Sequence, residues 1–147
     1  MTISIRPVQP VDREAWGRLY RGYAAFYRVE QSEEMRARVW SWLMDPGHEV
    51  RGLVADSGGT LLGLAHFRPF ARPLSASVGG FLDDLFVGPD ARGGGAAEAL
   101  IEGVRAAGRA EGWSVIRWIT AEDNYRARGL YDRMAERTRW VTYDIRL

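Results

Sequence analysis

The stretch that decides the fold of this chain is FLDDLFVGPDARGGGAAEAL, residues 81–100. Residues 81–87 are mostly aromatic and aliphatic, as in a strand, and a helix with Leu100, Ile101 and Val104 on its apolar face follows. Three glycines after Arg92 lead into that helix, and no Ser, Thr or Asp caps its start. Uncapped N–H groups at a helix start, approached over glycine, favour a phosphate, and an arginine adds a fork of donors. The sequence therefore predicts a phosphate-binding loop here.

The spacing of this loop separates three known kinds of phosphate loop. A Walker A loop needs Gly-Lys followed by Ser or Thr, and this chain contains no lysine at all. A dinucleotide-binding fingerprint places its first glycine at the strand end, whereas here residues 89–92 precede the glycine cluster. The Walker A loop is excluded and the dinucleotide-binding fingerprint is disfavoured, as is a plain flexible turn, because the strand and helix on either side are well marked.

The rest of the chain supplies the other elements of a mixed sheet. We expect strands near residues 3–5, 50–55, 60–67, 81–87, 114–119 and 139–147. Helices are expected over residues 11–29, 32–44, 96–111 and 124–135, and residues 68–80 read as an irregular loop. This order, β-αα-βββ-α-β-α-β, predicts an α/β fold of one domain, residues 1–147, with helices on both faces of a mixed sheet.

The loop resembles the acyl-CoA site of the GNAT superfamily of N-acetyltransferases, whose hallmark is Gln/Arg-x-x-Gly-x-Gly/Ala. Arg92-Gly93-Gly94-Gly95-Ala96-Ala97 matches it, and Asn124, Ala127 and Leu130-Tyr131 are similar to a later family segment. The resemblance spans nearly the whole chain, although Ala135-Glu136 stand where the family often has Gly-Phe. It implies a largely antiparallel GNAT-like sheet, with acetyl-CoA as the acetyl donor. The residues that it implies for acetyl-CoA binding are Leu85, Phe86, Val87, Arg92, Gly93, Gly94, Gly95, Ala96, Ala97 and Asn124.

Two carboxylates in the strand bear on the chemistry. An alkylammonium has a pKa of about 10.4, so roughly one molecule in two or three thousand is a neutral nucleophile at pH 7. Asp83 and Asp84 occupy successive strand positions, so we expect them on opposite faces, with one facing the reaction. Resemblance to polyamine-acetylating members favours Asp83 as a base acting through water, and Asp84 then holds a cationic part of the substrate. A salt bridge or an acidic turn is the alternative.

The remaining site residues come from the resemblance and from the aromatic helices. Tyr131 is similar to the family tyrosine that returns a proton to the leaving thiolate, and the strand end near Phe86 and Val87 would donate backbone N–H groups to the developing oxyanion. Asn124 caps its helix or contacts the coenzyme. Tyr23 and Tyr27 are predicted to line the acceptor pocket. His48 and His66 are isolated in the sequence and receive no role.

Composition limits the partners. The 147 residues contain no cysteine, which excludes thiol nucleophiles and cysteine-ligated metals, and we predict no metal site. A formal charge of +1 gives no strong nucleic-acid signal, and residues 1–10 hold no long apolar run. We therefore expect a cytoplasmic protein with no membrane partner. Its expected substrate is a small-molecule amine such as a polyamine, amino acid or lysine-like compound, and a homodimer is a possible oligomeric state. An acyl-CoA sensor without turnover and a toxin-type enzyme that acetylates aminoacyl-tRNA are the rival functions.

Overall fold

The computed structural model describes residues 2–147 and contains one five-stranded sheet in the order β1-β2-β3-β4-β5. The first four strands are antiparallel neighbours, and β5 runs parallel to β4. Their bounds are β1 Ser4–Pro7, β2 Arg51–Ser57, β3 Thr60–Arg72, β4 Ser77–Val87 and β5 Ile116–Arg117. The predicted mixed, largely antiparallel α/β fold is confirmed.

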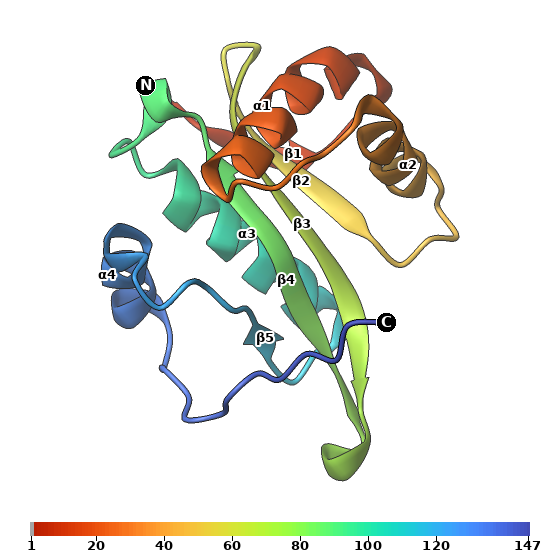
Figure 1. Ribbon diagram of the computed structural model, residues 1–147, viewed down its shortest axis with the longest axis vertical. Helices are drawn as coiled ribbons and strands as arrows, with labels where there is room; N and C mark the ends of the chain where they lie inside the picture. The colour runs from red at the N-terminus through yellow and green to blue at the C-terminus, as the bar shows by residue number, and fades with distance from the viewer. Residues whose placement is uncertain (1) are drawn as a thin grey trace.

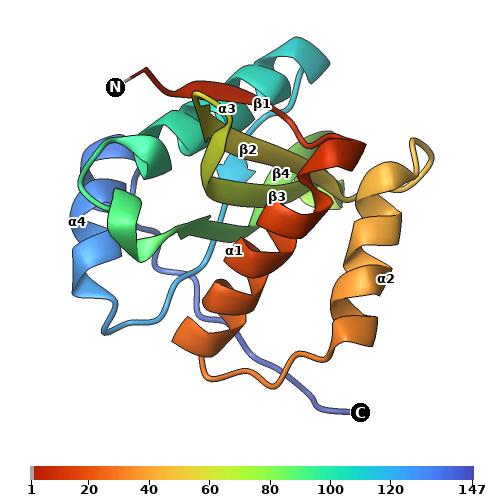
Figure 2. The same ribbon diagram turned by 90° about the horizontal axis from the view of Figure 1, so that it is seen from above.

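Helices cover both faces of this sheet, as Figures 1 and 2 show. Helices α1, Arg13–Phe26, and α2, Glu33–Met44, lie on one face, and α3, Ala96–Glu111, lies on the other with α4, Tyr125–Met134, beside it. Local signals set their ends: the Ser32 hydroxyl accepts a hydrogen bond from the N–H of Met35 at 3.1 Å, and α3 stops at Gly112, whose φ is 74°.

Two separate cores hold these layers together. The core under α3 is aliphatic apart from one phenylalanine and consists of Leu53, Ala55, Ala65, Phe67, Leu82, Ala96, Leu100, Ile101 and Val104. The core under α1 and α2 is mostly aromatic and consists of Trp16, Tyr20, Trp40, Leu64 and Phe86. Strand alternation sends successive residues of β3 to different cores, so that Leu64 and His66 lie on the α1 face while Ala65 and Phe67 lie on the α3 face.

A β-bulge in β4 changes the predicted placement of the two aspartates. His66 pairs with Asp84 while the next residue, Phe67, pairs with Leu82, so Asp83 is the extra residue. Asp84 bonds His66, and Asp83 bonds Arg68, which lies two residues further along β3 and therefore on the same face as His66. The prediction of opposite faces is wrong, because the bulge interrupts the alternation at this point.

The segment predicted as a loop, residues 68–80, is instead mostly strand. β3 continues to Arg72 and β4 begins at Ser77, with Pro69 paired to Gly80. Gly80 is required by packing rather than by a turn, because a Cβ at this position would lie 2.3 Å from the Trp113 ring.

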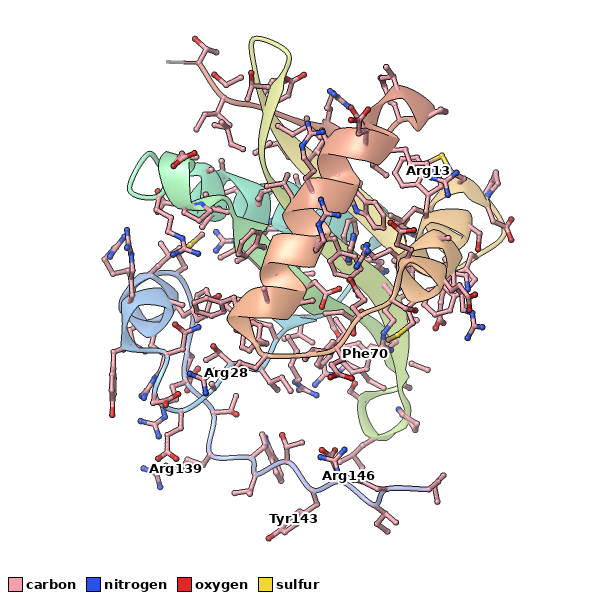
Figure 3. All side chains as sticks on the ribbon, turned by 45° about the horizontal axis from the view of Figure 1, so that its top comes forward. Arg13, Arg28, Phe70, Arg139, Tyr143 and Arg146 are labelled. Atoms are coloured by element: carbon pink, nitrogen blue, oxygen red, sulfur yellow. The ribbon has the colours of Figure 1, made fainter. Side chains whose placement is uncertain are left out.

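The last two predicted strands are shorter than expected or missing. Ladder pairing confines β5 to Ile116 and Arg117, and the predicted strand 139–147 pairs with no strand in the described part of the chain. This segment runs along the outside of the molecule (Figures 1 and 3), and its apolar side chains are exposed. A strand needs a neighbour to bond its backbone, and in the described part of the chain this segment lies alongside none.

Candidate active site

The loop between β4 and α3 has the geometry of an anion site. Gly93 and Gly95 adopt φ values of 84° and 89°, and a Cβ on either would meet no atom within 4 Å, so the loop's backbone is open. Gly95 is the N-cap residue of α3 and offers no capping side chain, so the N–H groups of the first turn, from Ala96 onward, have no side-chain acceptor. The residues present therefore fit the pyrophosphate of coenzyme A, which would bind at this helix N-terminus.

Arg92 lies at the entrance to this loop. Its guanidinium carbon is 5.6 Å from the centre of the Phe26 ring and 5.8 Å from that of Phe86, and its Nε donates to the carbonyl of Val87 at 3.4 Å. The side chain is thus held between β4 and the end of α1, with its remaining N–H groups available to a phosphate.

The edge of β4 beyond this loop is open. The ladder between β4 and β5 ends at the pair Phe81–Arg117, so residues 82–87 have no strand partner on that side among the described residues. The N–H of Gly88 bonds the carbonyl of Leu62, and the alternation of an antiparallel ladder then directs the N–H groups of Leu85 and Val87 to the open edge. By the same alternation, the N–H of Phe86 points toward β3 and belongs to the β3–β4 ladder. The backbone N–H groups directed to the open edge are therefore those of Leu85 and Val87, and the expectation that Phe86 presents its N–H there is wrong.

Asp84 lies in a polar site inside the aromatic core. Its Oδ2 atom is 2.8 Å from Nδ1 of His66 and accepts a hydrogen bond from the hydroxyl of Tyr20 at 3.0 Å. His66 is 2% exposed, and its Nε2 accepts from the indole N–H of Trp16 at 2.9 Å. About 20% of the Asp84 side chain remains exposed, so this carboxylate joins a buried network to the surface.

Asp83 has a different setting. Its carboxylate forms an ion pair with Arg68 at 3.0 Å, and both side chains are about one third exposed. Burial raises the pKa of Asp83, and the hydrogen bond from Arg68 opposes that rise. The cation already paired with Asp83 makes it a weaker electrostatic partner for a substrate ammonium than Asp84, whose partners are His66 and Tyr20.

A tyrosine cluster adjoins Asp84. Tyr23 stacks on Tyr20 at 6.1 Å and meets Tyr27 edge-on at 5.0 Å between ring centres. Burial, followed by the nearby Asp84 charge, raises the pKa values of Tyr20 and Tyr23 well above that of a free phenol, so both are hydrogen-bond donors throughout the neutral range. The structure thus places Tyr23 near Asp84 and Tyr27 against Tyr23, and their role in lining the acceptor pocket stays a prediction.

Tyr131 and Asn124 come from α4. Tyr131 packs edge-on against Trp118 with ring centres 5.4 Å apart, and burial, with a smaller contribution from nearby Tyr27, raises its pKa to about 12. Tyr131 therefore lies close enough to the tyrosine cluster to affect it electrostatically. The Asn124 side chain does not cap α4; its amide donates to the Thr120 hydroxyl at 3.2 Å, so the capping alternative is wrong.

Sequence reasoning missed His66, Arg68 and Trp16 as neighbours of the two aspartates. His66 stands 18 positions before Asp84, and only the register of the β3–β4 hairpin places them opposite one another. Extending both strands through residues 68–80 would have suggested that register.

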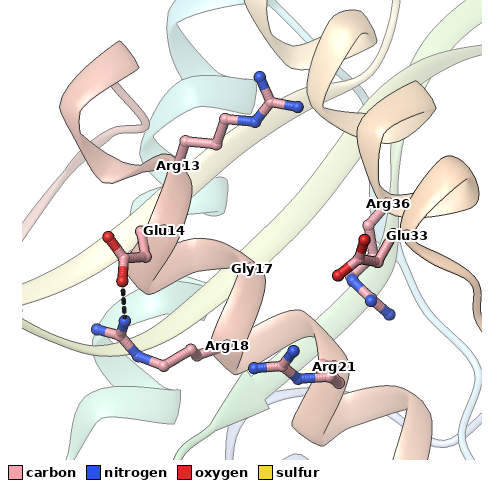
Figure 4. A pocket seen from close by; sticks show the side chains of 7 residues that line it. All are labelled: Arg13, Glu14, Gly17, Arg18, Arg21, Glu33 and Arg36. Atoms are coloured by element: carbon pink, nitrogen blue, oxygen red, sulfur yellow. Dashed lines mark hydrogen bonds and ion pairs between the residues drawn. The ribbon is translucent and has the colours of Figure 1, made fainter.

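Two cavities lie outside this group of residues. One of about 540 Å³ lies between α1 and α2 (Figure 4) and has four arginines and two glutamates among the residues that line it: Arg13, Glu14, Gly17, Arg18, Arg21, Glu33 and Arg36. Another of about 250 Å³ lies beside β5. No cluster of three or more potential metal ligands occurs among residues 2–147, and no helix there is long and apolar enough to cross a membrane.

Comparison with known proteins places this site in a family. The model of the acetyltransferase (GNAT) family matches residues 16–135. The D-amino-acid N-acetyltransferase HPA3 of Saccharomyces cerevisiae is 28% identical over 96% of this chain and 89% of its own. A ribosomal-protein-alanine N-acetyltransferase from Brucella melitensis shares the fold with a TM-score of 0.83, 24% identity and complete coverage of both chains.

A further solved structure shares the fold and contains a coenzyme A derivative. The aminoglycoside acetyltransferase AAC(6')-Iy, solved with the bisubstrate analogue CoA-S-monomethyl-acetylneamine, has a TM-score of 0.85 at 19% identity, again with complete coverage of both chains. The family match covers the glycine loop, both aspartates and Tyr131. The chain therefore belongs to the GNAT family of acetyltransferases and is an N-acetyltransferase that uses acetyl-CoA.

Proposed function

We propose that the protein, acting as one domain over residues 1–147, transfers the acetyl group of acetyl-CoA to a primary amine of a small molecule. The observation that carries this proposal is Asp84, a partly exposed carboxylate flanked by Tyr20 and Tyr23. A carboxylate beside aromatic faces suits an ammonium group, which gains both an ion pair and cation–π contacts. The amine attacks the thioester carbonyl, the C–S bond breaks, and the thiolate of coenzyme A leaves.

The donor side of the reaction is assigned to the loop and the open strand edge. The first-turn N–H groups at Ala96 and Ala97, with Arg92, hold the pyrophosphate, and Gly93, Gly94 and Gly95 keep its approach open. The N–H groups of Leu85 and Val87 bind the extended arm of the coenzyme and its thioester oxygen. Asn124 is retained as a coenzyme contact through its side-chain oxygen.

The two aspartates are given unequal roles. Asp84 binds the substrate ammonium and accepts its proton, directly or through water, because its network leaves it without a neighbouring cation. Asp83, predicted as the base, is neutralised by Arg68 and is assigned to shaping the acceptor side of the site. Arg68 in turn offers a cation to acceptors that carry a carboxylate, such as amino acids.

Tyr131 is proposed to donate a hydrogen bond to the leaving sulfur. A pKa of about 12 keeps its phenol protonated at neutral pH. Because a thiol has a pKa of about 8.5, complete proton transfer from such a phenol to the thiolate is uphill by about 3.5 pKa units, or nearly 5 kcal/mol. Tyr131 therefore stabilises the thiolate by hydrogen bonding, and solvent supplies the proton.

The test is thiol release from acetyl-CoA across a panel of amines: D- and L-amino acids, diamines, polyamines, an aminoglycoside and an aminoacyl-tRNA. We expect release with at least one small primary amine and none with its N,N-dimethyl counterpart. Binding of acetyl-CoA without release for any amine would favour the sensor. Release with aminoacyl-tRNA alone would favour the toxin-type enzyme, and the four arginines between α1 and α2 would then be its first candidate RNA contact.

The C-terminal segment supports a homodimer as the functional form. Val141, Tyr143, Ile145 and Leu147 alternate along it and are 72–119% exposed, so they form one apolar face with nothing packed on it. Tyr143 projects away from the body of the molecule (Figure 3). The outer edge of β5 is unpaired in the described chain, and the 250 Å³ cavity beside it is lined by Trp113, Ile116, Trp118 and Met134 among others.

A second copy can satisfy both surfaces at once. Residues 139–147 of each chain would add a strand to the β5 edge of the other chain and place their apolar face over the 250 Å³ cavity of that chain. Because each chain gives its segment to the other, the dimer would have two-fold symmetry. Light scattering after gel filtration should give twice the chain mass, and the double variant Tyr143→Ser/Ile145→Ser should give a folded monomer. Asp144→Ser, on the opposite face of the segment, is the matched control. A monomeric wild-type protein would refute the dimer.

A further inference from the structure

We infer that His66 is a positioning residue that, held by Trp16, aims the Asp84 carboxylate at the substrate amine. The inference rests on the acceptor role proposed for Asp84. It starts from a continuous chain of hydrogen bonds, from Nε1 of Trp16 to Nε2 of His66 at 2.9 Å and from Nδ1 of His66 to Oδ2 of Asp84 at 2.8 Å. The first two side chains are each 2% exposed, and only the third reaches solvent.

The donor at one end of this chain fixes the proton on the imidazole. An indole nitrogen is a donor only, so Nε2 of His66 must be the acceptor and must carry no hydrogen. The one hydrogen of the neutral ring then lies on Nδ1 and points to Asp84. A hydrogen on Nε2 would face the indole N–H in a buried space, with no partner for either group.

The same arrangement fixes Asp84. Its Oδ2 receives two hydrogen bonds, from Nδ1 of His66 and from the Tyr20 hydroxyl, which together set the rotation of the carboxylate. A carboxylate has about four acceptor positions on its two oxygens, so the remaining ones are left for a ligand. Because Tyr20 and His66 also meet edge-on at 4.7 Å, and His66 lies 5.8 Å from Trp16, neither donor is free to turn away.

A structural role accounts for only one of the two ring nitrogens. A leucine at position 66 would fill the apolar space beside Trp40 and Leu64 but would leave the buried indole N–H of Trp16 without an acceptor, so Nε2 has a structural role and Nδ1 does not. A histidine there requires a partner on each ring nitrogen, and the partner on Nδ1 is the one residue of the network that is open to a substrate.

The tautomer is tested by long-range ¹H–¹⁵N NMR spectra at pH 8.5 on the whole protein. The chain has only two histidines, and the His48→Asn variant assigns them. Nδ1 of His48 accepts from the backbone N–H of Val50 at 3.0 Å, so His48 should carry its hydrogen on Nε2 and His66 on Nδ1. Two opposite tautomers are the expected result, and Nε2–H on His66 would overturn the inference. Trp16→Phe should convert His66 to a mixture of both forms.

The effect on the substrate is tested by steady-state kinetics with the best amine of the panel. His66→Leu should raise the KM for the amine at least tenfold while changing the KM for acetyl-CoA less than twofold. His66→Asn should recover most of the loss, because the amide nitrogen of asparagine, like Nδ1, lies two bonds from Cβ and can donate to Asp84. His48→Asn should match wild type. An unchanged amine KM in His66→Leu, or equal losses in the Leu and Asn variants, would refute the positioning role.

Failure of the proposed function gives a different pattern. If Asp84→Asn leaves the amine KM unchanged while the His66 tautomer is Nδ1–H, the carboxylate does not bind the acceptor although the hydrogen-bond chain exists. If Asp84→Asn raises the amine KM and His66→Leu does not, Asp84 acts without its histidine, and only the inference on His66 fails.

Discussion

The two faces of the sheet are built from different chemistry although they share the same strands. On the α3 face, the sheet and helix meet through aliphatic side chains and Phe67, and the core has no polar member. On the α1 face, aromatic residues surround His66, and Asp84 emerges from them. Both faces bury apolar side chains, but the α1 face gives up some apolar packing to hold a carboxylate in a fixed position.

The largest expected effect concerns the aliphatic face. Leu100→Ala removes a side chain with no exposed surface, and we expect a loss of about 2 to 5 kcal/mol in the free energy of unfolding. Leu64→Ala, equally buried on the aromatic face, is the matched variant and should lose a similar amount. Urea denaturation measures both. Only Leu64→Ala should also raise the amine KM, and an equal KM change in both variants would contradict the division between the faces.

The next effect concerns turnover rather than stability. Asp84→Asn keeps the shape of the side chain and an acceptor for His66 but removes the charge, so kcat/KM for the amine should fall about 100-fold. Asp83→Asn should lower it less than about fivefold, because this exposed carboxylate is already paired with Arg68. Thiol-release assays at pH 7.5 compare the two variants. A larger loss of kcat/KM in Asp83→Asn than in Asp84→Asn would indicate that Asp83 is the base.

The ion pair between Arg6 and Asp12, which belongs to neither core, provides a test by pH. Arg6 donates to both oxygens of buried Asp12, at 2.7 and 2.9 Å, and holds the pKa of that carboxyl below its usual range. A lowered folded-state pKa gives stability that is present above the unfolded pKa of about 3.9 and is lost as the pH falls through the folded value.

Asp12→Asn should therefore cost about 1 to 3 kcal/mol of unfolding free energy at pH 7. The difference from wild type should shrink as the pH falls below about 4. Unfolding curves measured from pH 3 to 7 give this difference, and amine KM should not change. If the difference in unfolding free energy between wild type and Asp12→Asn grew as the pH fell, the pKa of Asp12 would not be lowered in the folded protein.

The smallest expected effect separates binding from backbone strain in α3. Gly95 and Gly112 bound this helix with φ values of 89° and 74°, and neither would clash through a new Cβ. Alanine at either position should cost about 1 to 2 kcal/mol, because L-residues disfavour this conformation. Only Gly95→Ala should also raise the KM for acetyl-CoA, by several-fold, since only that end faces the pyrophosphate. Equal KM values for acetyl-CoA in the two variants would show that this loop does not bind the acetyl donor.

Much of this architecture was predictable from sequence because the signals are local. The glycines after Arg92, the absence of a cap before Ala96 and the apolar spacing through Leu100 each depend on a few neighbouring residues. They were sufficient for the family, the donor and the helix–sheet layers, all of which the structure and the comparisons confirm. Three of the failed predictions, the loop over residues 68–80, the strand over residues 139–147 and the opposite faces of Asp83 and Asp84, concern pairing between distant segments.

The amino-acid sequence was enough to predict a glycine loop at the start of α3, since helix starts and strand periodicity are properties of short stretches, and the motif in that loop carried the resemblance to the GNAT family. The contacts of the two aspartates were settled only by the packing of the whole chain. The bulge at Asp83 and the β3–β4 register put both carboxylates on one face, gave Arg68 to Asp83, and gave His66 and Tyr20 to Asp84. Register depends on the packing of whole strands between two cores, and no local pattern at Asp83-Asp84 contains that information.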